Sequence, residues 1–121
     1  MAVDAGLELH RRLGPGLLES VYRKVLAYEL RKRGLHVIEE QPIGVTWDAV
    51  QLDLGFRADL VIEDLVVVEV KSQEAILPVH KKQLLTHLRL MQKRVGLLLN
   101  FNVEVFRKGI TRIVNELDEN A

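Results

Sequence analysis

Two acidic side chains and a lysine near the middle of the chain are the residues best suited to chemistry: Asp59, Glu69 and Lys71. Glu69 and Lys71 end an apolar run, Leu65 to Lys71, whose composition predicts a central strand covered on both faces. Because side chains alternate along a strand, these two charged groups point the same way. Charges in such an apolar strand are costly unless they are paired or bound to something. The two residues therefore indicate either a salt bridge at a sheet edge or a binding site.

Asp59 lies on the preceding predicted strand, Ala58 to Ile62, which a tight turn connects to the next one. In an antiparallel pair, Asp59 shares a face with Glu69 only if the loop has an odd length, such as Glu63-Asp64-Leu65. We therefore predict an odd loop, a bulge or a bend at Asp59. Two converging carboxylates suit a hard cation such as Mg²⁺, and a neighbouring lysine adds a positive charge beside a water or phosphate. These are the parts needed for metal-assisted hydrolysis of a phosphodiester.

The elements that must position these residues alternate between helical and extended patterns. Helices are predicted over Val3–Leu13, Leu17–Arg33 and Val79–Lys93, and strands over 35–41, 43–47, 52–56, 58–62, 65–71, 95–101 and 110–114. The tail beyond Asn115 is expected to fray. This order predicts an α/β domain, residues 1–121, with a mixed sheet and helices on both faces.

The second predicted helix has clear sequence boundaries. Pro15 can serve as its first residue, and Gly34 ends it. Its apolar stripe is predicted to comprise Leu18, Val21, Val25 and Tyr28, and the stripe of the preceding helix Val3, Leu7 and His10.

Composition limits the classes of function. The 121 residues, 48% of them apolar, suffice for one domain with a real core. The absence of Cys excludes disulfides and thiolate metal sites and fits a reducing cytosol. No apolar run approaches the ~20 residues of a membrane span. With 17 basic and 17 acidic residues, no global field attracts a polyanion. Contact with nucleic acid would depend on local basic patches, which are otherwise solvated faces: Arg31, Lys32 and Arg33, and Lys82, Arg89 and Lys93.

The chain resembles a known nuclease superfamily. Asp59, followed across a hairpin by Glu69-Val70-Lys71, resembles the PD-(D/E)XK signature, although no Pro precedes the Asp. The segment Gly16-Leu17-Leu18-Glu19-Ser20-Val21-Tyr22 fits the GxxExxY motif of a small prokaryotic family within that superfamily. The resemblance extends over nearly the whole chain. It implies a restriction-endonuclease-like fold, in which a mixed β-sheet is flanked by helices.

The resemblance also implies roles for individual residues. Asp59 and Glu69 would be metal ligands, joined by the backbone carbonyl of Val70 and by a further acid, Glu19. Lys71 would orient or activate the attacking water. Gln83 matches a polar residue that borders the site in relatives. The implied activity is that of a cytoplasmic Mg²⁺-dependent nuclease acting on DNA, with Mn²⁺ as a substitute and a homodimer as one way to cut two strands.

Less specific interpretations remain open at this point. Tyr22 is expected to be a core residue with a satisfied hydroxyl, and His10 a packed or capping residue. His87 stands where the family often has Tyr, and we expect a surface or interface residue rather than a ligand or base. The alternative function is a non-catalytic nucleic-acid-binding or assembly module that keeps the fold. An enzyme acting on a small phosphoester ranks lower, because the sequence has no Gly-rich phosphate loop.

Overall fold

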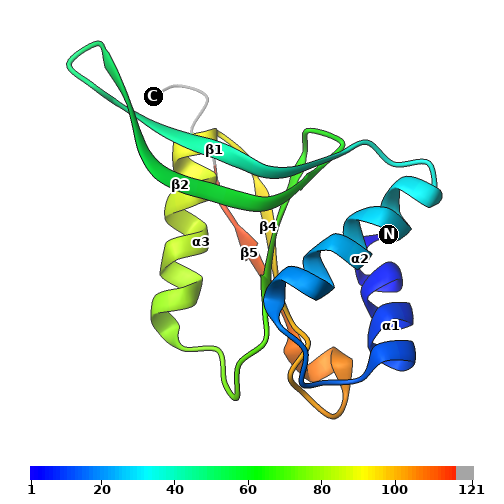
Figure 1. Ribbon diagram of the computed structural model, residues 1–121. Helices are drawn as coiled ribbons and strands as arrows, with labels where there is room; N and C mark the ends of the chain where they lie inside the picture. Colours follow the sequence, from blue (N-terminus) through cyan, green and yellow to red (C-terminus); the bar gives the residue numbers. More distant parts are fainter. Residues whose placement is uncertain (117–121) are drawn as a thin grey trace.

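The computed structural model describes residues 1–116 (Figure 1). Its elements, in chain order, are α1 (Ala2–Leu13), α2 (Glu19–Lys32), β1 (Val37–Trp47), β2 (Val50–Ile62), β3 (Val66–Lys71), α3 (Pro78–Met91), β4 (Val95–Asn100), the short 3₁₀ helix η1 (Phe106–Gly109) and β5 (Ile110–Val114). The fraying predicted beyond Asn115 falls mainly on residues outside this description. No helix within residues 1–116 is long and apolar enough to cross a membrane.

The strands form a five-stranded mixed sheet in the order β1-β2-β3-β4-β5. Only β3 and β4, which α3 connects, run parallel, and the other neighbours are antiparallel. Helices α1 and α2 cover one face of the sheet and α3 the other (Figure 1). The predicted α/β fold is therefore confirmed, with β3 at the centre of the sheet.

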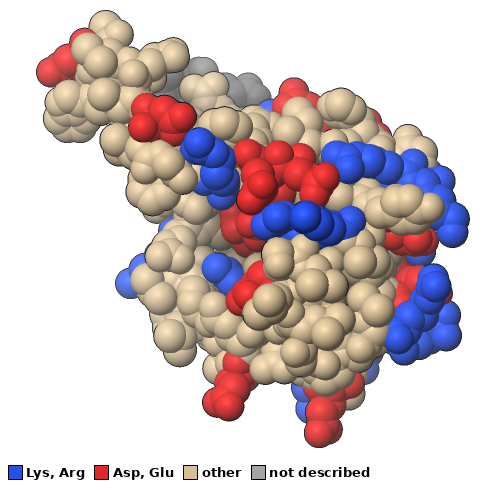
Figure 2. Space-filling model, viewed as in Figure 1, with Lys and Arg blue, Asp and Glu red and all other residues tan. Residues whose placement is uncertain are grey.

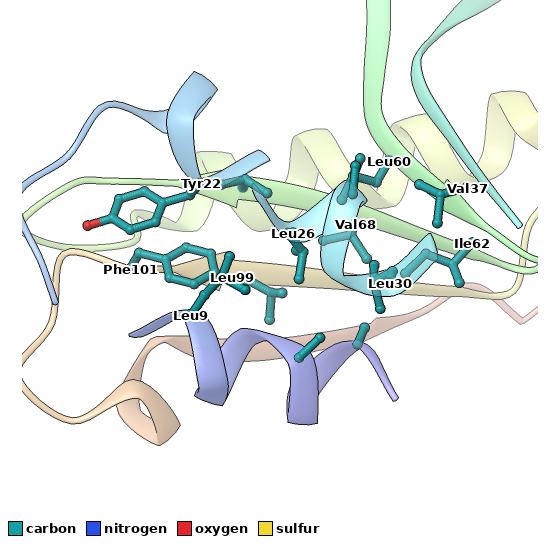
Figure 3. Close-up of a cluster of buried hydrophobic side chains, with 14 of the residues drawn as sticks. Leu9, Tyr22, Leu26, Leu30, Val37, Leu60, Ile62, Val68, Leu99 and Phe101 are labelled. Carbon is teal, nitrogen blue, oxygen red and sulfur yellow. The ribbon is translucent and has the colours of Figure 1, made fainter. Parts of the chain in front are cut away.

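Each face of the sheet has its own apolar core. Figure 3 shows the larger one, where side chains of α1 and α2 meet the sheet. Its members include Leu9, Tyr22, Leu26, Leu30, Leu60, Val68, Leu99 and Phe101. The smaller core joins α3 to the opposite face through Leu84, Leu88, Val61, Val67 and Leu98. Successive residues of β3 contribute to opposite cores, as expected for a central strand.

The predicted apolar stripe of α2 is wrong. Leu18, Val21, Val25 and Tyr28 are exposed, and the buried positions are Tyr22, Leu26, Ala27 and Leu30. Tyr22 determines this orientation, because its ring stacks on Phe101 with centroids 4.4 Å apart. The stripe proposed for α1 fails in the same way, since Ala2, Ala5, Gly6 and Leu9 are its buried residues. Both helices carry apolar residues on more than one face, and only contact with the sheet distinguishes the faces.

The start of α2 also differs from the prediction. The helix begins at Glu19, so Pro15 lies in the loop before it. Gly14 (φ 67°) and Gly16 (φ 102°) hold this loop in left-handed conformations that favour glycine. The Tyr22 hydroxyl donates a hydrogen bond to the Gly14 carbonyl (2.5 Å) and accepts one from the Leu17 amide (3.2 Å). Tyr22 is thus a core residue with a satisfied hydroxyl, as predicted.

Four predicted strands merge into two long ones, β1 and β2. Pro42 does not divide β1, because β1 is an edge strand and a register shift between Pro42 and Gly44 accommodates the missing amide hydrogen. The far half of this hairpin, residues 44–56, extends beyond the body as an arm (Figure 1). Figure 2 shows its surface as mostly uncharged, with acidic groups. The apolar residues exposed there are Trp47, Val50, Leu52, Leu54 and Phe56.

Candidate active site

The hairpin that joins β2 to β3 places the two central acids on one face. Ile62 pairs with Val66, so the loop between them has the three residues Glu63-Asp64-Leu65. The odd loop predicted from the sequence is therefore confirmed. The same register continues through Leu60, which pairs with Val68, and places Asp59 opposite Glu69 at the next step.

The backbone pairing between β2 and β3 extends from Ile62 back to Leu60. At Asp59 the side chain, and not the backbone, bonds to β3. An Asp59 carboxylate oxygen (Oδ2) accepts a hydrogen bond from the Val70 amide at 2.7 Å. Beyond this point β2 turns away toward the arm (Figure 1). Asp59 is therefore held at the fork between the two strands, with its carboxylate directed at β3.

The Asp59 carboxylate lies close enough to Glu69 for the charge of Glu69 to affect its ionisation. Burial, followed by the negative charge of Glu69, raises the pKa of Asp59 to about 6. The hydrogen bond from Val70 and the positive charge of Lys71 act in the opposite direction but do not outweigh these effects. The Glu69 side chain is only 11% exposed. A half-buried acid, Asp59, next to a buried one, Glu69, forms an arrangement that a bound cation would stabilise.

Helix α3 supplies the other wall of the site. A small cavity of about 30 Å³ lies between α3 and the strands β3 and β4. Its lining residues are Glu69, Lys71, His80, Gln83, Leu84, His87 and Leu98. The structure thus brings Gln83 together with Glu69 and Lys71, as the resemblance implied. Glu69 and Lys71 form no ion pair with each other in the described part of the chain, and β3 is central, so the interpretation as a salt bridge at a sheet edge is wrong.

His87 was expected on the surface or at an interface, and the structure places it half-buried beside Glu69. Its side chain is 19% exposed, and its Nδ1 lies 3.5 Å from Glu69 Oε1. The ring also lies 6.1 Å from that of Phe56. Gln83 and His87 are four residues apart on one helix face. That spacing was the signal in the sequence that could have placed His87 beside the site together with Gln83.

The structure does not place Glu19 against the other acids. This residue is half-buried at the first position of α2. The loop before it contacts the end of β3, since the Ser72 hydroxyl donates to the Leu17 carbonyl at 2.6 Å. Across residues 1–116, no three acidic or histidine side chains are gathered as a ready-made metal group. The role of Glu19 as a metal ligand stays a prediction.

Sequence reasoning missed Asn100, a buried polar residue at the end of β4. Its amide group accepts a hydrogen bond from the Gln73 amide (3.0 Å) and donates one to the Gln73 carbonyl (2.8 Å). The Phe101 amide donates to the Lys71 carbonyl at 2.9 Å. Together these bonds hold the chain just after Lys71. A lone Asn at a strand end carries no signal of this role in the sequence.

The residues at the fork fit a divalent cation. Asp59 and Glu69 supply carboxylate oxygens, the ligands that Mg²⁺ prefers. Glu69 Oε1 is buried and has no hydrogen-bond partner among the described residues. A buried oxygen without a partner is costly, and a cation would satisfy it.

A mixed sheet between helices, with an Asp, a Glu and a Lys gathered where its central hairpin forks, defines a restriction-endonuclease-like domain. The family model of the PD-(D/E)XK nuclease superfamily matches residues 1–113, and the chain belongs to this superfamily. Comparisons with curated proteins and with solved structures gave no significant match.

Proposed function

We propose that the chain is a metal-dependent nuclease that hydrolyses phosphodiester bonds in DNA, built as one domain of the GxxExxY type. Membership of the superfamily supports nuclease activity. The observation that carries the proposal is the pair of neighbouring acids at the fork, half-buried Asp59 and buried Glu69, with Lys71 beside them.

In this proposal Asp59, Glu69, the backbone carbonyl of Val70 and Glu19 hold Mg²⁺, or Mn²⁺ in its place. A bound divalent ion lowers the pKa of a water molecule and neutralises charge that develops on the phosphate. The carboxylate of Asp59 is already oriented by the Val70 amide, so little rearrangement is needed at this ligand. Glu19 would complete the set from the start of α2.

The remaining two residues act on the water and the substrate. Lys71 shares a face of β3 with Glu69, so its ammonium can orient the attacking water and stabilise negative charge on the phosphate. Gln83 on α3 lines the same cavity and is exposed at the surface, where its amide can hydrogen-bond the substrate.

The direct test is cleavage of labelled single-stranded DNA, double-stranded DNA and RNA with Mg²⁺, Mn²⁺ or EDTA. We expect cleavage that EDTA abolishes and that Glu69→Ala and Lys71→Ala each reduce at least about 100-fold, the lower range for general acid–base groups. Matched controls are Glu104→Ala and Lys108→Ala, exposed residues outside the site. Absence of cleavage of every substrate with either metal contradicts the proposal.

The second candidate is a non-catalytic nucleic-acid-binding or assembly module. The zero net charge favours it, because such a small domain has no overall field to attract DNA. Binding that Asp59→Asn leaves unchanged, together with no metal uptake in calorimetry, would support this candidate over the nuclease.

We also propose a cytoplasmic homodimer in which the arm contacts a second copy. An isolated two-stranded hairpin is marginally stable in water, and exposed apolar patches mark interaction sites. Trp47 near the tip is 71% exposed, and Asp48 and Asp53 make the arm a poor surface for DNA. The absence of Cys suits the cytosol.

Sedimentation equilibrium tests the dimer. The double variant Trp47→Ser, Leu54→Thr should be monomeric, and Tyr28→Ser, which alters an exposed apolar residue of α2, should remain dimeric. A monomeric wild-type protein at high concentration contradicts the proposal.

A further inference from the structure

The unusual feature of the site is a pair of facing polar atoms that lie at ion-pair distance but form no hydrogen bond with each other or with any other described group. Glu69 Oε1 and His87 Nδ1 are both buried, and neither has a hydrogen-bond partner within residues 1–116. Each such atom costs free energy in the folded protein. Two such atoms facing one another suggest that a bound group contacts both of them.

The distance between the two atoms is informative. It is 3.5 Å, beyond the 2.7–3.2 Å of typical N–H···O hydrogen bonds. Two atoms each about 2.1 Å from one metal ion lie about 3.0 Å apart at an octahedral angle and about 3.4 Å apart at a tetrahedral one. The observed separation is therefore close to that of two ligands of one ion. For octahedral geometry, Glu69 Oε1 and His87 Nδ1 would have to approach each other by about 0.5 Å.

We propose that His87 Nδ1 is a ligand of the ion that Glu69 holds, and that it makes the site bind Mn²⁺ in preference to Mg²⁺. Mg²⁺ is bound by oxygen, whereas imidazole suits first-row transition ions. The inference rests on the metal site of the proposed function. It pairs a nitrogen ligand from α3 with the Glu69 oxygen from β3.

The competing interpretation is a simple ion pair between protonated His87 and Glu69. The two interpretations differ for His87→Asn, since asparagine places an oxygen where Nδ1 was and carries no charge. If His87 is a ligand, the variant loses preference for Mn²⁺ and keeps an oxygen donor for Mg²⁺. If His87 is only a cation beside the site, its removal strengthens binding of both ions equally.

The experiment measures metal binding without any catalytic assay. Calorimetry gives the dissociation constants of Mn²⁺ and Mg²⁺ for wild type and His87→Asn, and pulsed electron paramagnetic resonance of bound Mn²⁺ detects a directly bonded nitrogen. The matched control is His80→Asn, which alters a histidine lining the same cavity whose Nδ1 already accepts a hydrogen bond from the Leu77 amide. Wild-type protein labelled with ¹⁵N only in histidine tests the same point without a substitution.

We expect a nitrogen signal in wild type and His80→Asn that becomes a ¹⁵N signal on labelling and disappears in His87→Asn. We expect the Mn²⁺-over-Mg²⁺ preference to fall at least about tenfold in His87→Asn, the lower end for loss of a group that supports a metal ligand. Bound Mn²⁺ without a histidine nitrogen signal, or an unchanged preference in His87→Asn, overturns the inference and leaves the proposed nuclease intact. Failure of wild type to bind Mn²⁺ overturns both.

Discussion

Replacing Asp59 by asparagine should make the metal-free protein more stable at neutral pH. Asparagine keeps an oxygen that can accept the hydrogen bond from the Val70 amide, so the fork between β2 and β3 is retained. It removes the negative charge of a half-buried group next to Glu69. The substitution thus separates the structural contact of Asp59 from the cost of its charge.

The size of the effect follows from the pKa of Asp59. Burial, then the charge of Glu69, raises this pKa from its ordinary value of 3.8 to about 6. The folded protein therefore holds a proton more tightly than the unfolded chain. This stabilises the fold below the ordinary value, and the stabilisation is lost as the pH rises through about 6. A rise of this pKa from 3.8 to about 6 corresponds to about 3 kcal/mol, the upper limit of the stability that Asp59→Asn regains at about pH 8.

Urea unfolding in EDTA, from about pH 4 to about pH 8, measures this effect. The free energy of unfolding of wild type should fall with pH relative to that of Asp59→Asn, with the two closest at the acid end. Added Mn²⁺ should stabilise wild type and not the variant. The control is Asp53→Asn on the same strand, because a hydrogen bond from the Gly55 amide and the charge of Arg57 lower the pKa of exposed Asp53, which gives the opposite sign. Parallel pH profiles for wild type and Asp59→Asn would refute the reasoning.

Two further predictions concern the contacts that support the site. Tyr22→Phe should lower the free energy of unfolding by about 1–2 kcal/mol, because the hydroxyl makes two hydrogen bonds to the loop before α2, and urea unfolding measures this loss. Asn100→Ala should cost about 2–4 kcal/mol by leaving two backbone groups after β3 without partners, and hydrogen exchange should show faster exchange of the Gln73 amide. A stability within error of wild type in either variant would contradict its assigned role.

The central hairpin could be predicted because its signal is local. The alternation of side chains along a strand and the parity of a short loop are enough to place Asp59 and Glu69 on one face. The apolar composition of β3 identified it as the central strand, since a strand covered on both sides needs no polar positions. Here side-chain alternation and loop length predict the same placement of Asp59 and Glu69 that the tertiary structure shows.

The orientation of α1 and α2 could not be predicted in this way. Helix α2 carries one apolar set at Val21 and Val25 and another at Tyr22 and Leu26, and both sets have helical spacing. The second is buried because Tyr22 finds a stacking partner in Phe101, 79 positions later in the chain. Periodicity within a helix contains no information about such a partner.

The placement of His87 depends on the same kind of distant contact, and it changes how the site is understood. Asp59 and Glu69 alone would form an oxygen site, and the partial burial of Asp59 beside the charge of Glu69 makes that site unfavourable without a cation. Helix α3 adds a nitrogen on the side of Glu69 that neither β2 nor β3 covers. Binding of the proposed ion would offset the cost of enclosing these two acids and of leaving Glu69 Oε1 without a hydrogen-bond partner among the described residues. The fork is thus locally unstable in the metal-free protein, and a bound metal ion would relieve this instability. The stability of Asp59→Asn in EDTA measures the cost of the Asp59 charge. The nitrogen signal of His87 tests whether this residue binds the ion.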